Sequence, residues 1–161
     1  MKLNKLVKST LAATALMASA IGFAADIDTN ADANDLAIKG YDTVAYFTMS
    51  KPVLGSAEYS ANYKNATYHF VSAEHRDLFK ANQEKYAPQF GGFCAMGTAM
   101  NLKFDVDPTA WKVVDGKLYL NLNKDVQKAW LRDVPGNIKT AETNWPELKG
   151  LTPEEAQAKN G

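Results

Sequence analysis

Residues 68–97 constrain the fold of this chain most, because they predict a strand, a helix and a glycine turn in direct succession. Side chains alternate between two faces along Tyr68–Val71, which is typical of a strand. Ser72 follows in the position of a helix N-cap, and the helix is predicted from Ala73 to about Tyr86. Gly91-Gly92 then permit a tight turn or a close backbone approach. This strand–helix unit is the centre of the predicted fold.

The rest of the chain adds hairpins and C-terminal helices to this unit. Asp115-Gly116, placed between two apolar runs, is a strong signal for a β-hairpin. The other predicted elements are a strand over Val44–Phe47, a helix that starts after Asn123 and runs through Leu131, a short helix over Ile138–Trp145 and a capping box at Thr152–Glu155. The predicted fold class is therefore α+β: a small single domain with antiparallel hairpins, a central strand–helix unit and C-terminal helices.

The N-terminus has the parts of a secretory signal peptide. Three lysines near the start precede an uncharged apolar run over residues 11–23, and Gly22 and Ala24 supply the small residues of a cleavage site. The run is too short to span a bilayer, which takes roughly 20 apolar residues. We therefore expect residues 1–24 to be removed on export to the periplasm or the medium, which leaves no stable membrane anchor.

Composition divides the processed chain into three parts. Residues 25–38 are acidic and poor in large apolar side chains, so a flexible lead-in is expected there. Residues 39–146 contain the predicted strands and most of the predicted helices, and they form the domain proper. Residues 147–161 are predicted to be a short C-terminal tail or helix.

The charge of the chain argues against a nucleic-acid partner. Cleavage near Ala24 would remove three of the 18 basic residues and none of the 18 acidic ones, which leaves a net charge of −3. Lysines and arginines form no cluster along the sequence. Because nucleic-acid binding depends on neutralising phosphates, this class of partner is not expected.

Enzyme signatures are largely missing from the sequence. It contains no glycine-rich phosphate loop, no His-Glu-x-x-His, no Gly-x-Ser-x-Gly and no Cys-x-x-Cys. A non-enzymatic role is therefore favoured. The catalytic alternative is a thiolate activated by a Cys94–His75 pair, since these residue types can form a nucleophile and its base.

Soft-metal binding is the sharper hypothesis for the same region. Cys94, Met96 and Met100 lie within seven residues of one another, and His75 lies on the helix before them. Thiolate, thioether and imidazole ligands together suit Cu(I) better than harder ions. His69, the only other histidine, is a candidate for an additional or supporting ligand. The structural alternative is a buried, inert cysteine with methionines that fill the core.

The residues around this stretch resemble a known family. The sequence Thr67-Tyr68-His69-Phe70-Val71-Ser72-Ala73-Glu74-His75-Arg76 is similar to the YHS domain, which is named for tyrosine, histidine and serine residues and occurs in copper-transporting ATPases and some hydroxylases. Gly-Tyr-Asp-Thr-Val-Ala-Tyr-Phe (40–47), Tyr-Ala-Pro-Gln-Phe-Gly-Gly-Phe-Cys-Ala (86–95) and Asp-Gly-Lys-Leu-Tyr-Leu-Asn (115–121) resemble its secreted bacterial branch. The resemblance implies a small α+β unit over residues 39–146.

The resemblance also bears on metal binding. The metal-associated branch of the family carries three cysteines at positions that match Ala45, Val71 and His75 of this chain. Imidazole therefore stands at the third of these positions, and aliphatic side chains stand at the other two. Cys94 belongs to the Gly-Gly-x-Cys-Ala element of the secreted branch.

Two functional hypotheses follow from the sequence. In the first, the chain is a secreted YHS-domain protein that binds a metal, preferably copper, through His75 and Cys94, with Met96, Met100 and His69 as further groups. In the second, it is a non-enzymatic periplasmic module with a structural Cys94, whose many aromatic side chains line a pocket for a small ligand or form a surface for a periplasmic protein partner.

Overall fold

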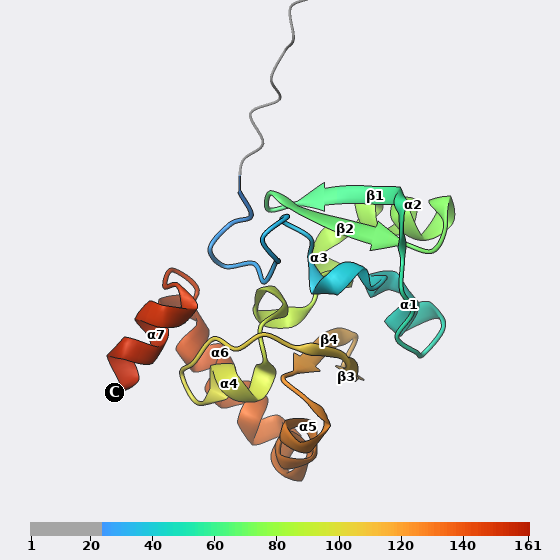
Figure 1. Ribbon diagram of the computed structural model, residues 1–161. Helices are drawn as coiled ribbons and strands as arrows, with labels where there is room; N and C mark the ends of the chain where they lie inside the picture. The colour runs from blue at the N-terminus through green and yellow to red at the C-terminus, as the bar shows by residue number, and fades with distance from the viewer. Residues whose placement is uncertain (1–23) are drawn as a thin grey trace, which may run out of the picture.

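The computed structural model describes residues 24–161 of the chain (Figure 1). The predicted signal peptide therefore lies, except for Ala24, outside the described residues. The helices are α1 (Thr43–Thr48), α2 (Ala73–Ala81), α3 (Gln83–Tyr86), α4 (Ala95–Ala99), α5 (Lys124–Trp130), α6 (Val134–Leu148) and α7 (Pro153–Asn160), with 3-10 turns η1 (Ile38–Gly40), η2 (Gln89–Gly92) and η3 (Leu131–Asp133). The strands are β1 (Ser56–Tyr63), β2 (Ala66–Phe70), β3 (Asp107–Val114) and β4 (Lys117–Asn121).

These elements form two halves, each built around one antiparallel hairpin (Figure 1). In the upper half of the figure, β1 and β2 pair with each other and pack against α1 and α2. In the lower half, β3 pairs with β4, and α4 and α5 pack against this second hairpin. Helix α6 packs against α4, and α7 lies at the far left of the figure. The predicted α+β class with antiparallel hairpins and C-terminal helices is confirmed.

The β3–β4 hairpin separates two apolar clusters. One of its faces, which includes Leu118 and Leu120, joins a large core that continues under β2 and α2. The other face presents Tyr119, which packs at 5.6 Å from the ring of Trp130 in a smaller cluster with Phe90. Side chains of a strand alternate between its faces, so one short hairpin serves both clusters.

Local sequence signals account for several element boundaries. Asp115 and Gly116 both have positive φ, 50° and 73°, as the predicted two-residue hairpin turn requires. The Ser72 hydroxyl accepts from the N–H of His75 at the start of α2, and the Asn123 side chain accepts from the N–H of Val126 at the start of α5. Thr152 and Glu155 form the predicted capping box of α7.

The strand predicted over Val44–Phe47 is instead the helix α1. The reason is Asp42, whose carboxylate accepts from the N–H groups of Val44 and Ala45 and so caps a helix at this point. The β-branched and aromatic composition of Val44–Phe47 suits a strand, but the Asp42 cap and the tertiary packing decide the conformation. Thr43, Val44, Ala45 and Tyr46 are buried in this helix.

Two helix predictions are wrong in their boundaries. The helix predicted from Ala73 to Tyr86 is divided into α2 and α3, because Asn82 leaves helical geometry and its side chain caps α3. The helix predicted over Ile138–Trp145 is longer at both ends. Pro135 lies in the first turn of α6, where its missing N–H costs nothing, and the helix continues past Pro146 to Leu148.

Residues 25–38 are part of the packed domain, contrary to the prediction of a flexible lead-in. Ala37 and Ile38 are buried in the core, and the N–H of Asp26 donates to the carbonyl of Lys64. The N–H of Asn30 donates to the carbonyl of Gly91. A Cβ at Gly91 would lie 1.7 Å from the Asp28 carbonyl oxygen, so this contact requires glycine. Backbone hydrogen bonds therefore hold residues 25–38 against the domain, although their acidic composition predicts a flexible segment in solvent.

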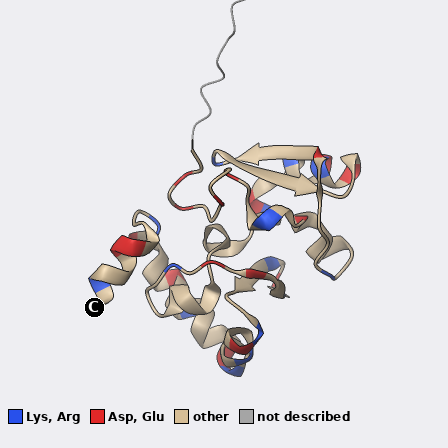
Figure 2. Ribbon diagram, in the orientation of Figure 1, with Lys and Arg blue, Asp and Glu red and all other residues tan. Residues whose placement is uncertain are grey.

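Figure 2 shows acidic and basic residues interspersed along the ribbon, with carboxylates prominent in the segment before η1. In the part of the chain from residue 24 onwards, no helix has the length and apolar character needed to cross a bilayer.

Candidate functional site

Asp42 is the centre of a buried polar cluster in the upper half of the domain. Its side chain is fully buried, and its Oδ1 accepts from the N–H groups of Val44 at 2.8 Å and Ala45 at 3.1 Å. Its Oδ2 accepts from the N–H of Val71 at 2.9 Å and lies 2.6 Å from Nδ1 of His75. The carboxylate therefore joins the start of α1, the end of β2 and the first turn of α2.

His75 is oriented by this carboxylate. Because Asp42 is an acceptor, Nδ1 of the imidazole carries the proton and donates to Oδ2. Nε2 then faces the hydroxyl of Thr48 at 3.2 Å. The side chain of His75 keeps 12% of its surface exposed, so the ring edge reaches solvent. Both ring nitrogens have protein partners in this arrangement.

Cys94 is the centre of a second buried polar cluster, in the lower half. Its side chain is fully buried at the N-cap of α4, and its sulfur accepts from the N–H groups of Gly97 at 3.3 Å and Leu122 at 3.2 Å. The thiol lies 3.7 Å from Oδ1 of Asn121. Burial raises the pKa of the Cys94 thiol, and the backbone N–H groups offset this only in part. A buried, protonated thiol is unreactive.

The candidate metal ligands occupy separate surroundings. The polar contacts of His75 are with Asp42 and Thr48, whereas those of Cys94 are with Gly97, Asn121 and Leu122. Within residues 24–161, no three His, Cys, Asp or Glu side chains gather in a way that could hold a metal ion.

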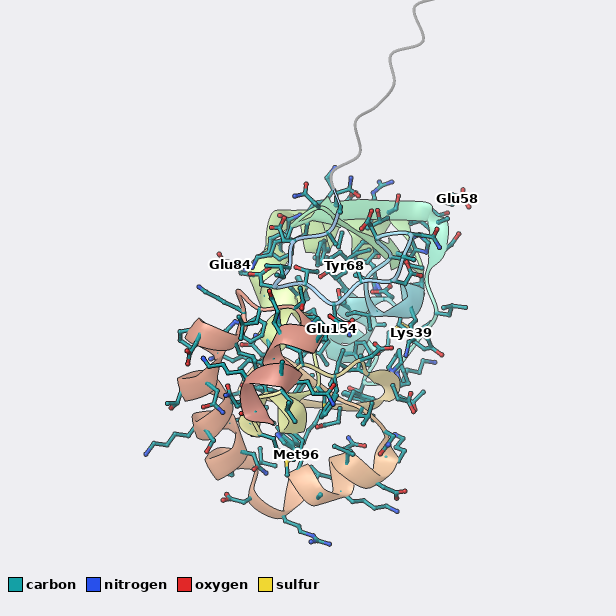
Figure 3. All side chains as sticks on the ribbon, turned by 60° about the vertical axis from the view of Figure 1, so that its left-hand side comes forward. Lys39, Glu58, Tyr68, Glu84, Met96 and Glu154 are labelled. Carbon is teal, nitrogen blue, oxygen red and sulfur yellow. The ribbon has the colours of Figure 1, made fainter. Side chains whose placement is uncertain are left out.

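The remaining candidate ligands are Met96 in α4, Met100 directly after it, and His69 on β2. Met96 packs between the two apolar clusters, in the lower half of Figure 3, while Met100 follows α4 with 56% of its surface exposed. His69 lies on β2 beside Gly40. If Gly40 carried a Cβ, that atom would lie 3.3 Å from Nδ1 of His69. Neither methionine sulfur nor the ring of His69 makes a hydrogen bond to the other predicted ligands in the described part of the chain.

A groove between α1 and β3 has three aromatic residues in its lining. It has a volume of about 470 Å³ and is lined by Tyr46, Phe47, Ser50, Trp111, Lys112 and Val113. The rings of Tyr46 and Trp111 lie 5.2 Å apart, and Phe47 packs edge-on against Tyr86 at 5.4 Å. Phe47 and Trp111 remain partly exposed. The volume lies within the range of small-molecule sites.

Tyr46 forms the floor of this groove. It is almost fully buried and its hydroxyl donates to the carbonyl of Pro108 at 2.7 Å. Burial raises the pKa of Tyr46 far above its ordinary value, so the ring stays neutral. The floor is therefore buried and uncharged, while Ser50 and Lys112 give the rim its polar groups.

Sequence reasoning missed Asp42 and Thr48 as partners of His75. A signal for Asp42 was present, because an aspartate directly before Thr43-Val44-Ala45 is a typical N-cap. Its link to a histidine 33 positions away depends on tertiary packing. Phe47 and Trp111 stand out as aromatic residues in the sequence, but their meeting across one groove does not follow from spacing.

Comparisons with known proteins supply no relative for this chain: no family model matches it, and searches of curated proteins and of solved structures return no match.

Proposed function

We propose that this chain is a non-enzymatic, exported binding module of YHS type, in which the groove between α1 and β3 takes a small ligand and Cys94 is structural. The observation that carries the proposal is the pair of partly exposed aromatic rings, Phe47 and Trp111, in one groove of about 470 Å³. Aromatic walls with a few polar groups at the rim are typical of small-molecule sites.

The lining of the groove favours a ligand with a flat apolar body and a negative charge. Phe47 and Trp111 offer ring faces and edges for stacking. Lys112 is the charged side chain of the lining, which contains no carboxylate. The domain has a net charge of −3 after cleavage, so Lys112 makes the groove more favourable for an anion than most other parts of the surface.

A dye of this chemistry tests the groove directly. The purified protein is titrated with 1-anilinonaphthalene-8-sulfonate, an aromatic anion, and binding is followed by fluorescence. We expect one saturable site that is weakened roughly tenfold in Phe47→Ala, the effect of about 1.4 kcal/mol of lost contact. Lys112→Ala should weaken binding several-fold, whereas Lys117→Ala, on the same hairpin but outside the groove, should not change it. Equal effects of the two lysine variants would refute the assignment.

The surroundings of Cys94 support its structural role. A fully buried sulfur that accepts two backbone N–H groups already has partners for its lone pairs. A metal at this position would have to displace Gly97 and Leu122 and open the core around α4. The contacts thus favour the binding module over a copper site built on Cys94.

Copper binding remains a separate prediction with its own test. Cu(I) is titrated into the protein under reducing conditions, with competition by a chelator of known affinity. The binding-module proposal predicts no tight site, and no difference between the wild type and Cys94→Ser. One tight site that is lost in Cys94→Ser or His75→Ala would replace the proposal with the copper hypothesis.

A further inference from the structure

Helix α7 is attached to the domain with very little apolar contact. Ala156 is the buried residue of this helix, while its other residues are exposed. Its remaining attachments are polar and lie at the surface: Lys159 pairs with Glu147, and Asn160 donates to the carbonyl of Asn101 at 2.7 Å. Exposed polar pairs contribute little to stability, so these contacts hold α7 weakly.

Lys103 holds the segment that leads into α7. It is 3% exposed, and its ammonium donates to the carbonyls of Leu151 at 2.6 Å, Lys149 at 3.1 Å and Ile27 at 2.8 Å. The three N–H donors of one lysine therefore join the end of α6, the linker before α7 and the N-terminal segment. Lys103 therefore anchors the segment directly before α7 to the rest of the domain.

Aromatic rings complete the surroundings of this ammonium group. Its Nζ lies 4.7 Å from the ring centre of Phe93 and 5.6 Å from that of Trp145. A cation over aromatic faces is stabilised even where water is scarce. The linker thus closes over a charged group whose acceptors, within residues 24–161, are the three carbonyls named above.

A half-open groove lies beside the first turn of α7. Its volume is about 270 Å³, and Pro153, Glu154 and Gln157 of α7 form one wall. Phe93, Leu102 and Phe104 line the opposite side, next to Lys103. Glu154 lies in this first turn and is exposed (Figure 3). A half-open groove along a helix means that the helix lacks packing contacts there.

We propose that residues 149–161, with α7 at their centre, form a lid that opens independently of the rest of the domain and that Lys103 is the lock that keeps it closed. Opening widens this groove along Phe93, Leu102 and Phe104 and breaks few apolar contacts. Segments with few buried contacts open locally at lower free energy than the core. This inference does not depend on the ligand groove, which lies between α1 and β3.

Native-state hydrogen exchange, read by mass spectrometry at pH 7, tests the lid. In the wild type we expect the amides of residues 156–160 to exchange at least tenfold faster than those of β2. Their exchange rates should change little at low concentrations of urea. Lys103→Met keeps an apolar stem but removes all three donors. It should accelerate exchange at residues 156–160 at least tenfold more than at β2. Lys39→Met, which removes another lysine that donates to a backbone carbonyl, should leave α7 unchanged.

A second variant tests the lid without unpairing the three carbonyls. Ala156→Arg places a long charged side chain at the buried contact of α7. The proposal predicts loss of protection at residues 156–160 and less than a threefold change at β2 and β4. Exchange of α7 in step with β2 in the wild type, or an equal loss of protection in α7, β2 and β4 in either variant, would overturn the proposal.

Discussion

The two halves of the domain each contain one buried polar centre, and the two centres are made of different chemistry. In the upper half the carboxylate of Asp42 accepts three backbone N–H groups and the imidazole of His75. In the lower half the thiol of Cys94 accepts two backbone N–H groups at longer distances. Each centre ties a helix start to the end of a strand, at Val71 after β2 and at Leu122 after β4.

The carboxylate and the thiol differ in the free-energy cost of burying them. An unpaired carboxylate in the interior is very unfavourable, so the upper centre depends on every one of its partners. A thiol is weakly polar and behaves as a small apolar side chain, so the lower centre depends mainly on packing. The two centres should therefore respond very differently to substitution.

Asp42→Ala should have the largest effect. It removes the N-cap of α1 and leaves His75 without its acceptor, which together should lower the free energy of unfolding by about 3–5 kcal/mol. Urea denaturation followed by circular dichroism measures this loss. A loss below about 1 kcal/mol would mean that the upper centre contributes little to the fold.

His75→Ala should have an intermediate effect. The carboxylate keeps its three backbone donors but loses the imidazole, so we expect a decrease of about 1–3 kcal/mol in the free energy of unfolding. A double-mutant cycle with Asp42→Ala isolates the coupling between the two side chains. Additive losses would show that the 2.6 Å contact contributes no stability of its own.

Cys94→Ala should have a smaller effect than either substitution in the upper centre. It removes one sulfur atom from a packed site and two weak hydrogen bonds, at a cost of about 1 kcal/mol. The same denaturation experiment measures this value beside that of His75→Ala. A loss larger than that of Asp42→Ala would reverse the ranking of the two centres.

A further expected effect is a pH dependence carried by Lys103. Burial lowers the pKa of Lys103 to about 8, and Asp28 and Glu155 partly offset this shift. Below pH 8 the folded chain bears the cost of a buried charge. As the pH rises toward the ordinary lysine pKa, the folded chain releases this proton before the unfolded chain does, so stability is gained.

A comparison of the wild type with Lys103→Met isolates this dependence. The raised pKa values of Tyr46, Tyr68 and Cys94 lower stability at alkaline pH in both proteins alike, so they cancel in the difference. We expect the wild type to gain stability relative to the variant between pH 7.5 and 9.5. A constant difference over this range would contradict the lowered pKa.

Sequence reasoning found the elements whose causes are local. Ser72, Asn123, Thr152 and Asp115-Gly116 act within a few residues, and each forms the predicted cap or turn. The composition of Val44–Phe47 predicts a strand, but the cap at Asp42 makes this segment the helix α1. The site was harder to predict, because the partners of His75 and Cys94 come from distant segments.

Composition also gives wrong predictions at the two ends of the described chain. Residues 25–38 have few apolar side chains, but their backbone groups bond to Lys64 and Gly91 and so order the segment. The end of α6 and the linker after it are held by Lys103, a residue type that composition assigns to the surface. Backbone hydrogen bonds between distant segments leave no pattern in the sequence.

The reactivity of Cys94 tests the central claim most directly, namely that this thiol belongs to a structural centre apart from His75. The native protein is treated with a thiol-specific disulfide reagent, and the rate is compared with that in denaturant and in the presence of Cu(I). The account predicts a native rate at least a thousandfold below the denatured rate, because the thiol is buried and its pKa is raised, and no effect of Cu(I). Rapid modification of the native thiol that Cu(I) blocks would contradict it.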